Sequence, residues 1–355
     1  MARRVLTLLI MLSVLALILA GCGGDTPEEI GAEPTTEAPV EEPTEAPAAP
    51  EEPTAEPADT EEPAATEQPE DSAGPMYDQP IVVGSKDFTE QLILGAMTVR
   101  LLEENGYEVD DRTGLGGTTV NRDALVAGEI DVYWEYTGTA LVNFLGVEEV
   151  ITDPEEAYTL ARDADAENGL VWLDMSEFNN TYTLMVKQET VDQGIVSISD
   201  LAAAINASPA DWRLCTNAEF YARPDGFRGV EELYGFQFQE ENVIAMDSGL
   251  TYQALQDGEC EVAMGFATDG RIAGFGFTNL EDDLGFFPTY NPSAVIRQEV
   301  LDADPHIGEV LNSMAASLDT PKMTDLNKRV DIDGEDVAAV ACDHLLQSGL
   351  VEACD

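Results

Sequence analysis

The strongest constraint on the fold is a regular alternation of strand-like and helix-like runs that begins near residue 80. Short β-branched runs such as Ile81–Val83 and Ile130–Trp134 alternate with segments of helical periodicity, among them Thr89–Asn105 and Thr118–Ala127. Parallel neighbouring strands need crossover connections, which are usually helices, so this alternation predicts mainly parallel sheets flanked by helices.

The alternation occurs in two sets, and the second set starts near Val196. Its strand-like runs are Trp212–Thr216, Asn242–Met246 and Cys260–Ala267. Two long extended stretches, Leu184–Gln188 and Phe286–Val295, separate the sets and look like chain crossings. We therefore expect an α/β protein of two lobes, with residues 79–185 and 291–355 in lobe 1 and residues 186–290, with the crossings, in lobe 2.

The N-terminus has the pattern of a lipoprotein signal peptide. Arg3 and Arg4 precede an apolar run that ends in Leu19-Ala20-Gly21-Cys22. We predict a signal peptide over residues 1–21 and lipid attachment at Cys22, which becomes the new N-terminus. A plain signal peptide or a membrane helix are the alternatives, but the apolar run is short for a membrane span.

Residues 22–78 are predicted to form a disordered stalk. They are dominated by Pro, Glu, Thr and Ala and contain neither Lys nor Arg. Such a segment cannot bury enough apolar surface to fold, and its like charges keep it extended. A binding tail is the alternative, which the repetitive composition disfavours.

The chain is strongly acidic. Its 70 acidic and 16 basic residues give a formal net charge of −54 at pH 7. Removing the acidic stalk leaves a balance that is still acidic, which argues against nucleic acid or an anionic membrane surface as a partner. The same charge suits a soluble domain in a salty exterior.

Two short runs place chemistry at the ends of predicted strands. Gly84-Ser85-Lys86-Asp87-Phe88-Thr89-Glu90-Gln91 and Tyr136-Thr137-Gly138-Thr139 each follow a strand-like run and open a helix-like segment. Ligands of open α/β sheets lie where strand ends meet helix starts. One of these junctions carries the cation Lys86 and the other carries the aromatic Tyr136. This combination suits a zwitterion with a quaternary ammonium group.

These runs resemble those of the extracellular solute-binding proteins of ABC importers for glycine betaine, carnitine and choline. Further matches, in the family's order, are Phe178–Tyr182, Asn217–Arg223, Met246–Tyr252, Thr268–Ile272 and Gly285–Tyr290. The resemblance extends from about Pro80 onward and implies a type II periplasmic-binding-protein fold with two chain crossings. It also implies lobes that close on ligand and deliver it to an ABC permease and its ATPase. The protein would be extracytoplasmic, at the cell surface or in the periplasm, and held to the membrane by its lipid anchor.

The resemblance implies that four aromatic rings enclose the trimethylammonium head, and we call them the aromatic cage. They are Tyr136, Tyr182, Phe266 and Tyr290. A ring face attracts a cation that cannot donate hydrogen bonds. Phe266 stands where relatives often have Tyr, so a hydroxyl contact is lost there. Each tyrosine has an alternative role as a half-buried packing residue.

The resemblance also implies donors for the ligand's carboxylate. Lys86 and Arg223 match cationic positions, and Thr139 adds its hydroxyl and N–H. Asn180 would contact the methyl-rich head, and Phe220 would wall the pocket. The alternatives are a solvated Lys86 and an Arg223 that simply pairs with Asp225.

Glycine betaine is the first expected ligand, and choline, carnitine and ergothioneine are the alternatives. We expect no enzyme activity, no cofactor and no metal, because the sequence lacks a Gly-x-Ser-x-Gly elbow and has only two histidines. A secreted glycoside hydrolase-like enzyme is the remote alternative, since pairs of carboxylates abound. Asp269 and Arg271 are predicted to be a structural pair or cap, and Tyr252 to pack its own helix.

Apart from Cys22, the cysteines form an even set in an oxidising compartment: Cys215, Cys260, Cys342 and Cys354. Three pairings are possible. A strand order of 2-1-3 in the second lobe would bring the strands of Cys215 and Cys260 together, which favours Cys215–Cys260 and Cys342–Cys354. A zinc site is disfavoured, because no Cys-x-x-Cys or nearby pair of histidines is present.

Overall fold

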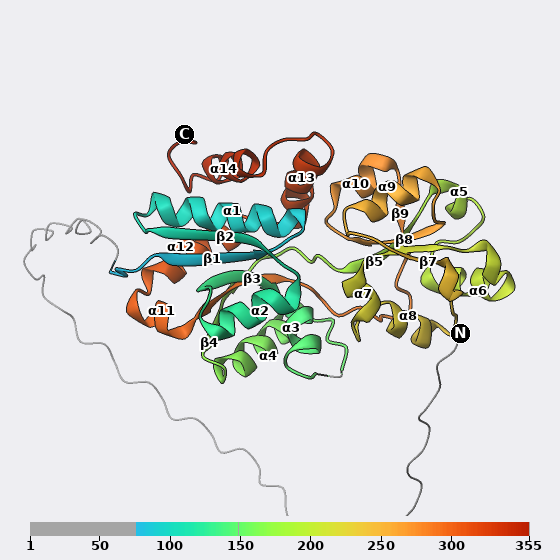
Figure 1. Ribbon diagram of the computed structural model, residues 1–355, viewed down its shortest axis with the longest axis horizontal. Helices are drawn as coiled ribbons and strands as arrows, with labels where there is room; N and C mark the ends of the chain where they lie inside the picture. The colour runs from blue at the N-terminus through green and yellow to red at the C-terminus, as the bar shows by residue number, and fades with distance from the viewer. Residues whose placement is uncertain (1–75, 148, 355) are drawn as a thin grey trace, which may run out of the picture. The chain divides into compact units, whose positions relative to one another are not determined.

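The computed structural model describes residues 76–147 and 149–354. They belong to one compact unit, in which two sheets covered by helices form two lobes (Figure 1). The predicted signal peptide, Cys22 and the stalk as far as residue 75 lie outside the described residues. No helix in the described part of the chain is both long and apolar enough to span a bilayer.

The sheet of the first lobe has the strand order β2-β1-β3-β10-β4. Its strands are β1 (Ile81–Lys86), β2 (Val109–Gly116), β3 (Val132–Tyr136), β4 (Leu170–Met175) and β10 (Pro292–Arg297). β1 is parallel to β2 and β3, whereas β10 is antiparallel to both β3 and β4. The sheet is therefore mainly parallel, as predicted, and the reversed strand is the one that returns from the second lobe.

Helices cover both faces of this sheet (Figure 1). They are α1 (Thr89–Glu104), α2 (Thr118–Ala127), α3 (Thr137–Asn143), α4 (Pro154–Ala166), α11 (Gln298–Ala303), α12 (His306–Ala315), α13 (Thr320–Asp331) and α14 (Val337–Gln347). The apolar side of α1, with Ile93, Leu94 and Met97, is fully buried against one face of the sheet. This packing fixes the start of α1, and that start carries part of the candidate site.

The sheet of the second lobe has the strand order β7-β6-β8-β5-β9. Its strands are β5 (Tyr182–Val186), β6 (Leu214–Thr216), β7 (Val243–Ala245), β8 (Val262–Phe266) and β9 (Thr278–Asn279). β6 is parallel to β7 and β8, and β5 is antiparallel to β8 and β9. The three parallel strands β7-β6-β8 thus have the 2-1-3 order considered from the sequence.

The helices of this lobe are α5 (Gln188–Val191), α6 (Ile198–Ala207), α7 (Ala218–Ala222), α8 (Phe227–Tyr234), α9 (Leu250–Asp257) and α10 (Gly270–Phe275), with short 3-10 turns η1 (Pro209–Asp211) and η2 (Glu240–Asn242). Buried aliphatic residues of α6 and aromatic residues of α8 fill the core on one side of the sheet. Tyr252 of α9 belongs to a smaller core on the other side.

The predicted boundary between the lobes at residues 185 and 186 is wrong. Tyr182–Val186 is strand β5 of the second sheet, so Leu184–Gln188 is not a crossing. The outgoing chain crosses before Tyr182, where the N–H of Asn180 donates to the carbonyl of Tyr290 on the returning chain, at 3.1 Å. A short apolar run fits a buried strand of either sheet, so its pattern does not reveal the sheet to which it belongs.

The predicted stalk also ends too late. The backbone N–H groups of Met76 and Tyr77 donate to Oδ2 of Asp304, at 2.7 and 3.2 Å. Tyr77 packs against the core of the first lobe. The folded part therefore includes residue 76, three residues earlier than predicted.

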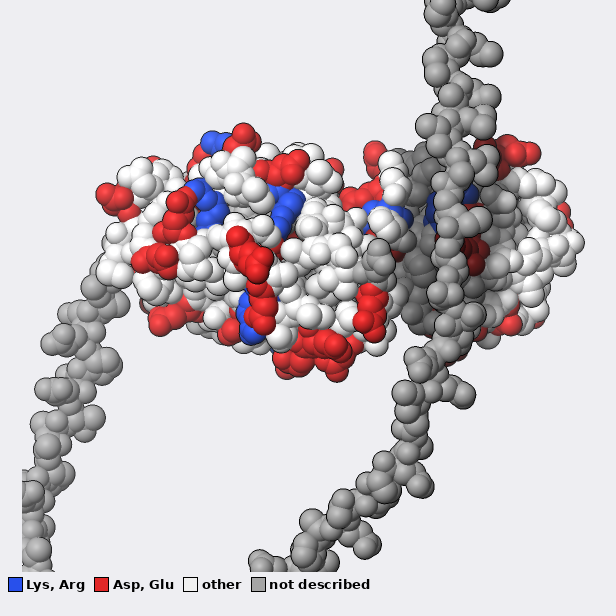
Figure 2. Space-filling model, turned by 90° about the horizontal axis from the view of Figure 1, so that it is seen from below, with Lys and Arg blue, Asp and Glu red and all other residues white. Residues whose placement is uncertain are grey.

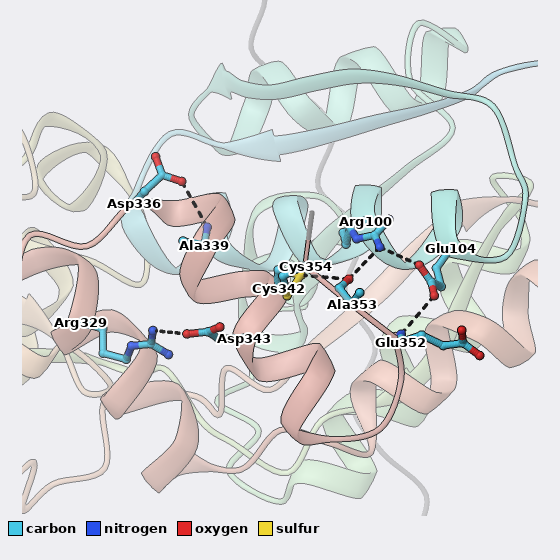
Figure 3. The surroundings of a disulfide bond; sticks show 10 residues. All are labelled: Arg100, Glu104, Arg329, Asp336, Ala339, Cys342, Asp343, Glu352, Ala353 and Cys354. Carbon is cyan, nitrogen blue, oxygen red and sulfur yellow. Dashed lines mark hydrogen bonds and ion pairs between the residues drawn. A yellow bond between two sulfur atoms is a disulfide. The ribbon is translucent and has the colours of Figure 1, made fainter.

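Both predicted disulfides are present. Cys215–Cys260 joins β6 to the chain just before β8, and Cys342–Cys354 joins α14 to the C-terminal segment. Figure 3 shows that this segment is also held to α1, where Arg100 donates to the carbonyl of Ala353 and Glu104 accepts from the N–H of Glu352. Among the described residues, no group of three His, Cys, Asp or Glu side chains is placed to hold a metal ion.

The acidic composition is visible on the molecular surface. On the face seen in Figure 2, acidic side chains are widespread, and the basic side chains are fewer and lie beside acidic ones. Among the described residues visible on that face, no broad positive area appears.

Candidate ligand site

A small cavity of about 40 Å³ lies between the two sheets. Except for Phe220, every predicted binding residue lines it: Lys86, Tyr136, Thr139, Asn180, Tyr182, Arg223, Phe266 and Tyr290. It adjoins a large cleft of about 510 Å³, and Phe88, Asn180, Glu219 and Phe266 line both. The sequence therefore identified residues that are far apart along the chain but meet in one place.

The first lobe contributes its residues from the ends of two neighbouring parallel strands. Lys86 ends β1, Tyr136 ends β3, and Thr139 lies in the first turn of α3. Gly138 in the same turn explains the short motif. A Cβ atom at this position would lie 2.6 Å from the carbonyl oxygen of Thr289 and 3.0 Å from the ring of Tyr290. Glycine thus lets the returning chain pass directly over α3.

The second lobe and the crossings contribute the rest of the cage. Tyr182 starts β5 and is paired in register with Phe266 at the end of β8. Their ring centroids are 5.3 Å apart. Tyr290, on the returning chain, presents its ring edge-on to Tyr182 at 5.5 Å. Tyr182 therefore belongs to the second lobe, although the sequence placed it in the first.

Two phenylalanines extend this aromatic cluster. Phe220 packs behind Tyr182 with the ring centroids 4.9 Å apart, so it supports the cage without lining the cavity. Phe88, which sequence reasoning missed as a site residue, stacks on Tyr136 at 6.3 Å and on Phe266 at 5.2 Å. The sequence offered one indication of this role: Phe88 follows Lys86, the last residue of β1, by two positions.

Lys86 is not a free cation. Its Nζ lies 2.6 Å from Oε1 of Glu135, and both side chains are buried. Glu135 also accepts from the Tyr133 hydroxyl at 2.8 Å and from the Tyr136 N–H at 2.7 Å. Lys86 still faces the cage, since Nζ is 5.1 Å from the centroid of the Tyr136 ring. A buried pair of this kind costs desolvation, which the additional bonds to Glu135 offset.

Arg223 is paired as well. It forms the ion pair with Asp225 that the sequence suggested as an alternative to ligand binding. Its Nε donates to Asp225 at 2.8 Å, and Nη1 lies 3.0 Å from Oε1 of Glu219. It also donates across the cleft to the hydroxyl of Thr139 at 3.3 Å. The guanidinium carbon lies 5.3 Å from the centroid of the Tyr182 ring. Arg223 therefore faces the cavity while its charge is already compensated.

Glu219 is a carboxylate of this site that was not among the predicted binding residues. It lines the small cavity and the large cleft. Burial acts to raise the pKa of Glu219, but the charges of Lys86 and Arg223 and a hydrogen bond from Thr118 outweigh it and hold that pKa below its ordinary value. An anionic group thus lies near both cations that were predicted to bind a ligand carboxylate.

The residues predicted to be structural have that role. Asp269 accepts from the backbone N–H of Arg271 at 2.9 Å and so caps α10, and the Arg271 guanidinium pairs with the same carboxylate. Tyr252 is fully buried beneath Arg271, and its hydroxyl accepts from the N–H of Phe266 at 2.9 Å. Tyr252 therefore fixes the end of β8 from outside the cavity.

The arrangement is suited to holding a small cation. Aromatic rings from both lobes and from the returning chain line the small cavity, and cation–π attraction and dispersion act between ring faces and an alkylated ammonium group. The charged side chains of Lys86, Arg223 and Glu219 also line the small cavity. The adjoining large cleft leaves space for a ligand that extends beyond the cage.

Comparison with known proteins agrees with this geometry. Residues 79–347 match the family model described as the substrate binding domain of ABC-type glycine betaine transport systems. A glycine-betaine-binding protein of Pseudomonas aeruginosa is 37% identical over 287 residues, which are 79% of this chain and 92% of that protein. The ergothioneine transport permease/ergothioneine binding protein EgtU of Helicobacter pylori is 33% identical over 77% of this chain and 48% of that protein.

A solved structure described as a glycine betaine/carnitine/choline ABC transporter has the same fold. It superposes with a TM-score of 0.62 at 30% identity and covers 76% of this chain and 99% of its own. The proteins matched are solute-binding proteins and not enzymes. The chain belongs to the family of substrate-binding domains of ABC-type glycine betaine transport systems.

Proposed function

We propose that this protein captures glycine betaine, or a closely related quaternary-ammonium compound, for osmoprotective uptake. The observation that carries the proposal is the meeting of Tyr136, Tyr182, Phe266 and Tyr290 around one small cavity. A cation that cannot donate hydrogen bonds gains most from such surroundings, because the rings replace its water without leaving a donor unpaired.

As a substrate-binding domain of an ABC-type system, the protein works outside the cytoplasm with a small ligand and a membrane permease. We extend this to a lipid anchor at Cys22 and to a cytoplasmic ATPase that drives the permease. The signal-like N-terminus supports the anchor. A relative named as both permease and binding protein supports the permease as the direct partner.

Within the cavity, we place the trimethylammonium head in the aromatic cage, with Asn180 beside it. The ligand's carboxylate then lies toward Lys86, Arg223 and Thr139. Support comes from the two cations, which both line the same cavity as the rings. Charge-assisted hydrogen bonds to a carboxylate are about twice as strong as neutral ones, so this end would set the orientation of the ligand.

Carnitine and ergothioneine remain the alternative ligands, and one observation favours them. The small cavity of about 40 Å³ opens beside a large cleft of about 510 Å³, so a ligand longer than glycine betaine has room to extend. Choline is also an alternative. Glu219 already places a negative charge near Lys86 and Arg223, so these two cations do not require a carboxylate from the ligand.

Isothermal titration calorimetry with a panel of ligands tests the proposal. We expect glycine betaine, carnitine, ergothioneine and choline to include at least one tight ligand, with glycine betaine the tightest. Glycine, which has the carboxylate but lacks the methyl groups, should not bind measurably. Failure of every quaternary-ammonium compound to bind folded protein would rule out the proposed function.

Glu219→Gln is expected to strengthen glycine betaine binding relative to choline binding by roughly threefold or more. The change removes a negative charge beside Arg223 and Lys86, so a ligand carboxylate meets less repulsion there. Choline has no carboxylate and gains nothing. The ratio of the two dissociation constants, measured by calorimetry, reports the effect.

Glu232→Gln is the matched control, because Glu232 is an exposed glutamate of α8 that does not line the cavity. It should leave the ratio unchanged. A gain in affinity cannot arise from damage to the fold. An unchanged ratio in Glu219→Gln would therefore place the ligand carboxylate away from Arg223.

A further inference from the structure

Glu90 is a buried carboxylate beside the cage that the site described above does not use. It lies in the first turn of α1 and is only 2% exposed. Its Oε1 accepts from the Tyr136 hydroxyl and from Nδ2 of Asn180, both at 2.7 Å. Its Oε2 accepts from the Thr268 hydroxyl at 2.5 Å and from Nδ2 of Asn327 at 3.1 Å.

These four donors come from four different parts of the fold. Tyr136 ends β3 of the first lobe, and Asn180 lies on the outgoing crossing. Thr268 follows β8 of the second lobe, two residues after Phe266, and Asn327 lies in α13. Two of the donors line the small cavity, and a third adjoins a cage residue. One carboxylate thus connects both lobes to the groups that would hold the ligand.

Burial disfavours the ionised form of the Glu90 carboxyl group. Burial raises the pKa of Glu90 above its ordinary value, and the hydrogen bonds from Thr268, Tyr136, Asn327 and Asn180 offset only part of this effect. All four partners reach the carboxylate through groups that can donate, and together they occupy the roughly four acceptor positions of an ionised carboxylate. A neutral side chain at this position could not accept all four bonds.

The lobes are in close contact beside this carboxylate. Nδ2 of Asn327 also donates to the carbonyl of Thr268 at 3.0 Å. Arg271 of α10 lies 3.2 Å from Asp331 of α13. A Cβ atom at Gly270 would lie 2.4 Å from Cβ of Lys328, so α10 and α13 touch through their backbones. The position of Thr268 is therefore coupled to α13 as well as to Glu90.

We infer that Glu90 is a positioning residue of the ligand site. It holds the Tyr136 ring and the Asn180 amide in place. Its bond to Thr268 fixes their position relative to the second lobe. Glu90 acts on the ligand through these neighbours, whose geometry determines how well the cage encloses a cation. This inference rests on the proposed function, because it requires a ligand in the cage.

Glu90→Gln tests this role with almost no change in shape. An amide accepts hydrogen bonds only at its oxygen, so in either orientation its NH₂ group faces the NH₂ group of Asn180 or Asn327, which cannot accept, beside a hydroxyl that can. We expect the affinity for glycine betaine to fall at least tenfold by calorimetry. Glu103→Gln makes the same charge change on an exposed residue of α1 and should leave the affinity unchanged.

A double-mutant cycle separates positioning from general stability. Tyr136→Phe keeps the cage ring and removes the hydroxyl that donates to Glu90. If Glu90 acts through that hydroxyl, the double variant should lose much less affinity than the product of the two single losses. The melting temperature of each ligand-free variant shows whether the loss of binding merely follows a loss of stability.

Each outcome decides the inference. The inference would be overturned if folded Glu90→Gln protein bound glycine betaine with an affinity within twofold of the unchanged protein. It would also be overturned if the losses of affinity in the double-mutant cycle multiplied fully. If Glu90→Gln does not fold, Thr268→Val removes one donor only and should weaken binding roughly threefold, and unchanged binding would again overturn it. A wild-type protein that binds no quaternary-ammonium compound would instead refute the proposed function.

Discussion

Replacing Tyr182 with alanine should weaken glycine betaine binding by roughly thirtyfold, which corresponds to ~2 kcal/mol, the scale of a desolvated cation–π contact. Tyr182 is the central ring of the cage, because its centroid lies 5.3 Å from that of Phe266 and 5.5 Å from that of Tyr290. Its removal also opens the cavity toward Phe220, which packs behind it. Calorimetry with the purified variant measures the change.

Tyr182→Phe is the matched control, because it keeps the ring face and removes only the hydroxyl. Its affinity should stay within about threefold of the original protein, as expected when the ring supplies most of the contact. Tyr136→Ala should also weaken binding, although it breaks the bond to Glu90 as well. If Tyr182→Ala folds and binds as tightly as Tyr182→Phe, the cage has been assigned to the wrong rings.

Removing the Cys215–Cys260 disulfide should lower the free energy of unfolding by about 4 kcal/mol, and removing Cys342–Cys354 should lower it by about 3 kcal/mol. The difference follows from the lengths of chain that they close, with sequence separations of 45 and 12 residues. A longer closed loop restricts the unfolded chain more. The variants are Cys215→Ala/Cys260→Ala and Cys342→Ala/Cys354→Ala, compared by urea unfolding.

Cys215, Cys260 and Cys342 are buried, whereas Cys354 is exposed, so the loss of buried sulfur atoms contributes to both variants but more to Cys215→Ala/Cys260→Ala. Treating the unchanged protein with a reductant provides a control, since it breaks the bonds without removing atoms. A C-terminal variant less stable than the Cys215–Cys260 variant would contradict the expected order. It would show that native contacts, such as those of Arg100 and Glu104 with the C-terminal segment (Figure 3), matter more than loop length.

The sequence predicted the architecture well where the pattern was long and locally consistent. The helix Thr118–Ala127 has the predicted bounds, and β6 and β8 are neighbours in the sheet, as the favoured disulfide required. The prediction failed at Tyr182–Val186. The apolar pattern of this segment predicts a buried strand, but it does not indicate which sheet the strand joins. That choice depends on partners such as β8, which lies about eighty residues further along the chain.

The sequence by itself determined the order of the elements, the two cysteine pairs that were favoured and the residues that gather in the small cavity. The order of the elements follows from local periodicity, which is a property of neighbouring residues. The cysteine pairs followed from an assumed strand order in the second lobe, and the cavity residues from the resemblance of short motifs to those of a known family. Only the tertiary structure decided how the charges are paired: Lys86 with Glu135, Arg223 with Asp225, and Glu90 with donors from both lobes. The strength of a charge interaction depends on distance and burial in the folded chain, and in so acidic a sequence the composition offers each cation many possible partners.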